Sequence, residues 1–179
     1  MISLKYKDTK DPFITNARYG DNIIPPDLTP PPVIPFEERT HIEFIYPHQQ
    51  DIDELCDLLQ KPNKVKTIWI HEKSYRYVKD LSKLYEILKT NNQVKTLKIN
   101  DMLITDLSSI ADMLKVNKSI KKLDLQYNLI NDTRPLIDVI LNNNSLKYIN
   151  LSNNDLIILK NDPINEALKV NPSLEIDYF

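Results

Sequence analysis

Two nine-residue stretches in the second half of the chain place apolar and polar residues in the same order. They are Ile120–Asn128 and Leu146–Asn154, and each has apolar residues at positions 1, 4 and 6 and asparagine at position 9. Positions 4 and 6 alternate with positions 3 and 5, whose side chains are mostly polar. This period of two predicts a β-strand that buries one face.

Earlier and later stretches repeat this order, so residues 41–179 are interpreted as one unit used several times. We place position 1 at six residues with spacings of 24, 29, 26, 26 and 28, namely His41, Val65, Val94, Ile120, Leu146 and Leu174. The residue order and the spacing are those of a leucine-rich repeat. At position 9, Lys73 and Met102 replace asparagine in the second and third repeats. A ladder of hydrogen-bonded asparagines is therefore expected only at Asn128 and Asn154.

The second half of each repeat has helical periodicity. Counting back from the next position 1, apolar residues recur ten and six places earlier and form one stripe that faces the strands. They are Leu55, Leu59, Leu84, Leu88, Ile110, Leu114, Leu136, Ile140, Ile164 and Leu168. Asparagine recurs three places before position 1, at Asn91, Asn117, Asn143 and Asn171. Because the repeats contain no glycine, we expect these asparagines to take the left-handed conformation that ends a helix.

The helices and the turns that follow them resemble the ribonuclease-inhibitor-like class of leucine-rich repeats. The turns that carry the resemblance are Asn117-Lys-Ser-Ile120, Asn143-Asn-Ser-Leu146 and Asn171-Pro-Ser-Leu174. The resemblance implies an α/β solenoid, with a short curved parallel sheet on the concave side and helices on the convex side. We expect about five repeats, followed by a closing strand that places Asp177 at position 4.

Residues 1–40 differ in composition from the repeats. They hold seven of the 12 prolines, which remove backbone donors and fix φ, so this arm is expected to be extended. One interpretation is that Val33, Ile34 and Phe36 cap the apolar end of the first repeat. The other is that the arm, which contains a P-x-x-P spacing, docks a partner. We therefore divide the chain into a proline-rich N-terminal arm or cap at 1–40 and a leucine-rich-repeat domain at 41–179.

Composition limits the cellular compartments in which we expect the protein. The chain is 41% hydrophobic, and no run approaches the roughly 18 apolar residues of a membrane-spanning helix. Residues 1–25 lack the basic start and apolar run of a secretory signal, and a single cysteine excludes an internal disulfide framework. We expect an intracellular protein of the cytoplasm, or of a host cytosol if a pathogen or symbiont produces it.

The motifs that carry catalysis are missing from the sequence. It contains neither H-E-x-x-H nor C-x-x-C, and its only glycine, Gly20, lies outside the repeats, which excludes a glycine-rich phosphate loop. Cys56 lies at helical spacing from Ile52 and Leu59, so we expect a buried core thiol. We expect no enzyme, no cofactor, no metal site and no small-molecule substrate.

The remaining candidate is a surface, because positions 3, 5 and 7 face the concave side, which in this repeat class commonly receives a protein ligand. Trp69, the only tryptophan, lies at position 5, and interface hot spots favour tryptophan. Ile45 is expected beside it on the preceding strand and Lys98 on the next, unless the arm covers Ile45 and Trp69. The candidate partner-binding residues are Ile45, Trp69, His71, Lys98, Asn100, Lys122, Asp124, Gln126, Tyr148 and Asn150.

Lysine occupies position 2 in four successive repeats, at Lys66, Lys95, Lys121 and Lys147. This row is either solvated or contacts an acidic protein or a nucleic-acid backbone, and the net charge of −2 argues against nucleic acid. From all of these features we predict a non-enzymatic scaffold that binds a protein partner through its concave face. The alternative is a small structural or accessory subunit of a larger assembly, docked by its proline-rich arm.

Overall fold

The computed structural model of the 179-residue chain describes residues 38–72, 78, 80–157 and 162–178. Almost all of the proline-rich arm and Lys73 lie outside the described residues, so what the sequence predicts for them stays a prediction. From residue 41 onward, strands and helices alternate along the described part of the chain.

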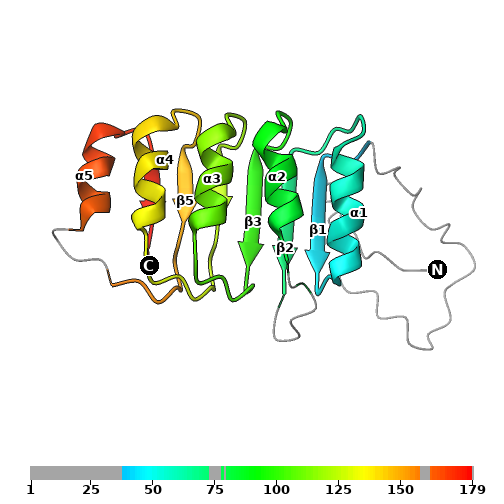
Figure 1. Ribbon diagram of the computed structural model, residues 1–179, viewed down its shortest axis with the longest axis horizontal. Helices are drawn as coiled ribbons and strands as arrows, with labels where there is room; N and C mark the ends of the chain where they lie inside the picture. The colour runs from blue at the N-terminus through cyan, green and yellow to red at the C-terminus, as the bar shows by residue number, and fades with distance from the viewer. Residues whose placement is uncertain (1–37, 73–77, 79, 158–161, 179) are drawn as a thin grey trace, which may run out of the picture.

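The strands form one six-stranded parallel sheet in chain order. They are β1 His41–Ile45, β2 Thr67–His71, β3 Thr96–Asn100, β4 Lys122–Asp124, β5 Tyr148–Asn150 and β6 Glu175–Asp177. The connections contain α1 Gln49–Leu59, α2 Ser82–Thr90, α3 Ser108–Val116, the 3-10 turn η2 Arg134–Leu136 with α4 Ile137–Asn142, and α5 Pro163–Val170. The helices lie on one side of the sheet (Figure 1). The predicted α/β leucine-rich-repeat solenoid is confirmed.

The core lies between the sheet and the helices, where the two predicted apolar stripes meet. Positions 4 and 6 of β2 to β5 are fully buried, at Ile68, Ile70, Leu97, Ile99, Leu123, Leu125, Ile149 and Leu151. The helical stripe is buried too, apart from Leu168, which packs against the core but is only partly buried. Full burial of one such side chain contributes about 1.5–3 kcal/mol, and each repeat needs its neighbours to complete that burial.

The register of β1 differs from the prediction by two residues. His41 pairs with Thr67, which is at position 3, so His41 is at position 3 and not at position 1. Ile42 and Phe44 therefore fill positions 4 and 6, and Ile45 is at position 7. A shift of two leaves the same face of a strand buried, so the alternation of apolar and polar residues could not reveal it.

The closing strand is shifted by one residue. Ile176 pairs with Ile149, so the prediction of Asp177 at position 4 is wrong and an apolar residue stands there. The reason is the length of the preceding loop, since the strand follows Asn171 one residue sooner than it follows Asn143.

The asparagines that end four helices do not take the left-handed conformation that we expected. Their φ angles are −68° at Asn91, −66° at Asn117, −104° at Asn143 and −119° at Asn171. Their side chains instead hydrogen-bond backbone groups of the turn that follows or of the preceding repeat, and we call these four residues the exit ladder. The sequence analysis identified the right residues and assigned them the wrong role.

Asn117 shows the bonding pattern of the exit ladder. Its Nδ2 donates to the carbonyl oxygens of Leu88 and Asn91 in the preceding repeat. Its Oδ1 accepts from the amides of Ser119 and Ile120 at 2.8 Å each. Asparagine recurs at this site because buried backbone groups of the loop require partners that no strand or helix supplies.

The second asparagine ladder is present at Asn128 and Asn154, as predicted. Asn128 Oδ1 accepts from the amides of Met102 and Ile104 in the preceding repeat, and its Nδ2 donates to the carbonyl oxygen of Ile99. Left-handed residues recur at position 8, just before this ladder, with φ of 56–57° at Tyr46, Asp101, Tyr127 and Asn153, and Leu103 is left-handed as well, with φ of 55°.

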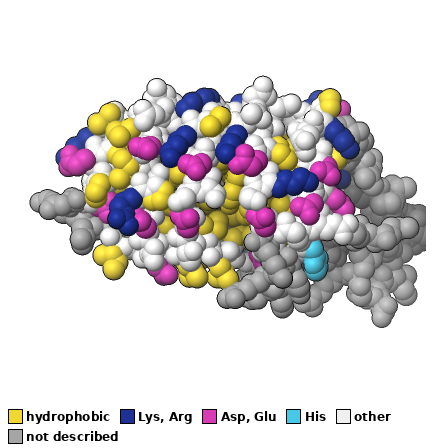
Figure 2. Space-filling model, in the orientation of Figure 1, with side chains coloured by type: hydrophobic (Ala, Val, Ile, Leu, Met, Phe, Trp, Pro, Cys, Tyr) yellow, Lys and Arg dark blue, Asp and Glu magenta, His cyan; other side chains and the backbone are white. Residues whose placement is uncertain are grey.

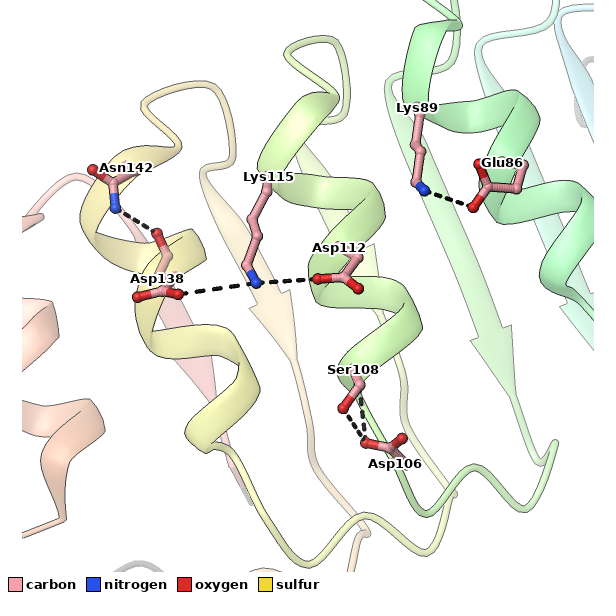
Figure 3. Close-up of polar contacts among 8 residues, drawn as sticks. All are labelled: Glu86, Lys89, Asp106, Ser108, Asp112, Lys115, Asp138 and Asn142. Carbon is pink, nitrogen blue, oxygen red and sulfur yellow. Dashed lines mark hydrogen bonds and ion pairs between the residues drawn. The ribbon is translucent and has the colours of Figure 1, made fainter.

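An aspartate precedes the start of four helical segments. The backbone amide two residues later donates to its carboxylate at 2.8–3.0 Å, at Asp80, Asp106, Asp132 and Asp162. Figure 3 shows Asp106 with Ser108, whose hydroxyl also donates to the carboxylate. Hydrogen bonds from serine lower the pKa of Asp80 and Asp106, and bonds from Arg134 lower the pKa of Asp132. These charged caps favour the helix starts.

Candidate binding face

The face of the sheet opposite the helices, which we call the open face, carries three rows of side chains. Parallel pairing aligns position 3, with His41, Thr67, Thr96, Lys122, Tyr148 and Glu175, and position 5, with Glu43, Trp69, Lys98, Asp124, Asn150 and Asp177. Position 7 adds Ile45, His71, Asn100, Gln126 and Ser152. All ten candidate residues lie in these rows.

Trp69 is half-buried on the open face and has a partner on either side. Its Nε1 donates to Oδ1 of Asn100 at 2.7 Å. Lys98 lies beside it on β3, with Nζ 4.8 Å from the centroid of the indole ring, a cation–π distance. The ring of His71 packs against it edge-on at a centroid distance of 6.3 Å. The tryptophan is therefore held in one orientation while part of its ring remains accessible.

A chain of hydrogen bonds continues from the tryptophan across β3, β4 and β5. Asn100 Nδ2 donates to Asp124 Oδ1 at 2.9 Å, and the same oxygen accepts from the amide of Gln126 at 3.2 Å. Gln126 Nε2 donates to Ser152 Oγ at 2.7 Å, and Ser152 Oγ donates to Asn150 Oδ1 at 2.6 Å. Polar groups on three neighbouring strands are thus fixed relative to one another.

Ile45 lies elsewhere on the open face than we expected. It pairs with His71, whereas Glu43 pairs with Trp69, so the prediction of Ile45 beside the tryptophan is wrong. The cause is the two-residue shift of β1. Ile45 is 49% exposed, and His71 Nε2 lies 3.5 Å from Asp101 Oδ2. Together they form the end of the open face nearest the loops that follow the strands.

Lys122 and Tyr148 pair at position 3, near the other end of the strands. Lys122 is exposed and forms no ion pair with a carboxylate in the described part of the chain. Burial raises the pKa of Tyr148, and the neighbouring carboxylate of Asp177 raises this pKa further. A hydrogen bond to the carboxylate of Asp177 also raises this pKa, so the phenol already has an acceptor on this face.

Three further residues belong to this face but were not among the candidates. Counting positions already places Glu43 and Ser152 there, but their exposures of 6% and 1% depend on neighbours in other repeats. Glu43 lies beside Trp69 and forms no hydrogen bond or ion pair within the described ranges. The candidate list did not include Asp101. The signal that could have found it is the pair formed by His71, at position 7, and Asp101, at position 8 of the next repeat.

Other kinds of site have little support from the described side chains. Within the described ranges, no three His, Cys, Asp or Glu residues are grouped so that they could hold a metal ion. Cys56 is fully buried as predicted, and burial raises its pKa to about 11. No described helix has both the length and the apolar character needed to cross a membrane.

No family model and no curated protein matches the sequence. Solved structures do match the fold. "Leiomodin-1 Actin-Binding Site 2" is 22% identical with a TM-score of 0.60, over 73% of this chain and 79% of that one. The tropomodulin C-terminal domain of Caenorhabditis elegans is 16% identical with a TM-score of 0.61, over 72% of this chain and 83% of that one. The repeated sequence pattern, the parallel sheet with helices on one side and these similarities in fold together identify the chain as a leucine-rich-repeat solenoid.

Proposed function

We propose that the chain is a non-enzymatic protein-interaction module that binds a protein partner through the open face. The observation that carries the proposal is the placement of Trp69, a large aromatic side chain held by Asn100 and Lys98 on a face that none of the described helices covers. A fixed aromatic group surrounded by polar side chains is typical of an interface hot spot.

The hydrogen-bond chain from Asn100 to Ser152 supports the same role. Binding requires side chains to be ordered, and each flexible side chain that must be immobilised costs about 0.5–1.5 kcal/mol. On this face the amides and the carboxylate of Asp124 are already ordered by one another. Lys98 and Asp124, paired at position 5, present charges of both signs, which favours a partner with a complementary pattern.

The similarity to the Leiomodin-1 fragment adds an analogy. That fragment is described as an actin-binding site, so a chain of this fold binds a protein there. From this analogy we take the class of ligand, a protein, and we propose an intracellular partner because the composition fits a reducing compartment.

Capture from a lysate of the source cells, with the purified chain immobilised, tests the proposal. We expect Trp69→Ala to weaken capture of the principal partner by about 30-fold, because truncating a hot-spot tryptophan costs on the order of 2 kcal/mol. The matched control is Val116→Ala at the exposed end of α3, which should leave capture unchanged. Circular dichroism confirms that both variants are folded, and equal recovery of every partner by wild type and Trp69→Ala would contradict the proposal.

A second measurement tests the location separately from the role. The chain has one tryptophan, so labelling it with 5-fluorotryptophan gives a single fluorine resonance from Trp69. Titration with the purified partner should shift or broaden this resonance. A partner that binds with full affinity and leaves the resonance unchanged binds elsewhere, and the open face would then be the wrong site.

A further inference from the structure

The edge of the solenoid where the helices return to the strands carries a row of lysines. In Lys95, Lys121 and Lys147, the backbone amide donates to the carbonyl oxygen of the lysine one repeat earlier, at 2.8–2.9 Å, and the row begins at Lys66. The four residues are therefore neighbours at the strand spacing of about 4.8 Å. Lys118 and Lys122 are exposed on either side of Lys121. These six residues are called the lysine edge: Lys66, Lys95, Lys118, Lys121, Lys122 and Lys147.

Carboxylates do not neutralise this edge. None of the six lysines forms an ion pair within the described ranges. Lys95 Nζ donates to the carbonyl oxygen of Asn92, and Lys147 Nζ donates to the hydroxyl of Ser173, so these acceptors are uncharged. Aspartate and glutamate are absent from residues 60–68, 91–100, 117–123 and 143–150, which carry the six lysines. The next strand start contributes Glu175 beside Lys147, and Glu38 at the other end of the row is paired with Lys64.

The helical face of the same molecule is different. Lys83 on α2 pairs with Asp57 on α1 at 2.9 Å. Lys115 on α3 pairs with Asp112 at 3.1 Å and with Asp138 on α4 at 3.9 Å, as Figure 3 shows. Positive and negative side chains are interspersed over the helices (Figure 2). Unpaired positive charge is therefore concentrated on the lysine edge and is not a general property of the surface.

The backbone under the lysine edge is rigid. The exit ladder residues Asn117 and Asn143 each hydrogen-bond the loop before them and the two amides that precede Lys121 and Lys147. Like charges are thus held side by side, an arrangement that opposes folding. This row of adjacent lysines without ion pairs does not stabilise the fold, so it calls for another role. We propose that the lysine edge is a second binding surface, and that it takes an acidic segment of a polypeptide.

The dimensions of the edge fit such a segment. Lys66 and Lys147 are three strand spacings apart, or about 14 Å, which an extended polypeptide covers in four or five residues at about 3.3 Å each. The net charge of −2 on the whole chain does not cancel the positive field at the lysine edge. Asp124 and Glu175 lie close to Lys122 and Lys147, and two carboxylates against six lysines leave an excess of positive charge on the edge. Carboxylates beyond the other end of the strands, such as Asp101, are about 17 Å away along a five-residue strand, while the screening length is about 8 Å in physiological salt.

A nucleic acid or a membrane fits the edge less well. Proteins that bind single-stranded nucleic acid stack bases on exposed aromatic side chains. The aromatic residue next to the lysine edge is Tyr148, which pairs with Lys122 and is half-buried. The exposed residue beside the edge at the end of α3 is Val116, an aliphatic side chain. Membrane-surface segments place tryptophan or phenylalanine next to their lysines, and residues 60–68, 91–100, 117–123 and 143–150, which carry the six lysines, contain neither.

Fluorescence anisotropy with a labelled decaglutamate peptide tests the proposal on the full chain. The edge variant is Lys66→Glu with Lys121→Glu and Lys147→Glu, which leaves out Lys122 because that residue also lies on the open face. The control variant reverses three lysines of the helical face, Lys83, Lys115 and Lys169, so the net charge changes by the same amount.

We expect wild type to bind the peptide at about 20 mM NaCl, where charges act over tens of ångströms, and to lose most of that binding at about 300 mM. The edge variant should bind at least about tenfold more weakly than wild type, and the control variant within about twofold. Amide chemical shifts of the wild-type chain on adding peptide should change around Lys66, Lys121 and Lys147. If the edge variant does not fold, the same three lysines changed to glutamine serve in its place.

Three results would overturn the proposal. The first is equal weakening by the edge and control variants, which would mean that only net charge matters. The second is shift changes spread over the helices instead of the edge. The third is tighter binding of a decathymidine oligonucleotide or of vesicles containing phosphatidylserine than of the peptide, which would assign the edge to a nucleic acid or a membrane.

Discussion

Replacing Asn117 tests how the repeats are held together. Its side chain is 1% exposed and forms hydrogen bonds with two carbonyl oxygens of the preceding repeat and with the amides of Ser119 and Ile120. Alanine removes the acceptor of both amides, and each buried donor left without a partner costs about 1–3 kcal/mol. We expect Asn117→Ala to lower the free energy of unfolding by about 2–5 kcal/mol, a large part of the 5–15 kcal/mol typical of a native domain.

Glycine at the same position separates the two possible roles of this asparagine. If Asn117 served to adopt a left-handed conformation, Asn117→Gly would retain the stability of wild type. The structure has φ of −66° there, so glycine gains nothing from its conformational freedom and loses the same hydrogen bonds. We therefore expect Asn117→Gly to be at least as unstable as Asn117→Ala, with roughly 0.5–1 kcal/mol of further loss from backbone entropy.

Urea unfolding followed by circular dichroism measures both effects, and an unchanged m-value shows that the comparison is valid. Asn144→Ala is the matched control, because Asn144 is an exposed asparagine in the next loop of the same type, and its replacement should change stability by less than about 0.5 kcal/mol. Wild-type stability in Asn117→Gly together with a loss in Asn117→Ala would refute the hydrogen-bonding role. Losses below about 0.5 kcal/mol in both would mean that the ladder contributes little.

Other regions of the chain give three further predictions. Leu123→Ala should lower the free energy of unfolding by about 2–5 kcal/mol in the same urea assay, because the side chain is fully buried in the central strand, and a loss below about 0.5 kcal/mol would contradict a core role. The Cys56 thiol, with a pKa raised to about 11 by burial, should react with a disulfide reagent at pH 8 at least about 100-fold more slowly in the native chain than in urea; fast native labelling would show that it is accessible. The folded-state pKa values of Asp80, Asp106 and Asp132 lie below the unfolded value of about 3.9. The contribution of these carboxylates to folding stability is therefore complete above that pH and is lost as pH falls through the lowered pKa values. Thermal melts between pH 6 and pH 2 should therefore show a smaller acid-induced loss in the triple Asp→Asn variant than in wild type, and parallel curves would exclude this linkage.

The two register errors show what an alternating pattern can and cannot specify. Alternation identifies which face of a strand is buried, so Phe44, expected at position 4, was placed on the correct face although the strand was misplaced by two residues. Tyr46, expected at position 6, is exposed because β1 ends at Ile45. Only pairing with the neighbouring strand distinguishes two registers of the same parity. At β6 the shorter loop after Asn171 moved Ile176 into position 4, because backbone pairing with Ile149 rather than residue counting determines which side chains align.

The binding face also combines features that the sequence pattern predicts with features that only the structure shows. Position counting brought Trp69, Lys98 and Asn100 to one face, because side chains alternate along a strand and aligned repeats bring equal positions together. The exposure of Trp69, its bond to Asn100 and the burial of Glu43 depend on residues about one or two repeats away, which no local pattern encodes.

Local chemistry, carried by the repeat itself, was enough to determine the strand, the helix, the buried stripe and the asparagine positions of each repeat. The periods of two and of about 3.6 reflect the geometry of single elements, and the sequence contains them directly. The tertiary structure decided the register of β1 and β6, the role of Asn117 and the neighbours of Trp69. These features depend on contacts between repeats. A hydrogen bond between residues some 30 positions apart forms only when the folded solenoid brings neighbouring repeats into contact.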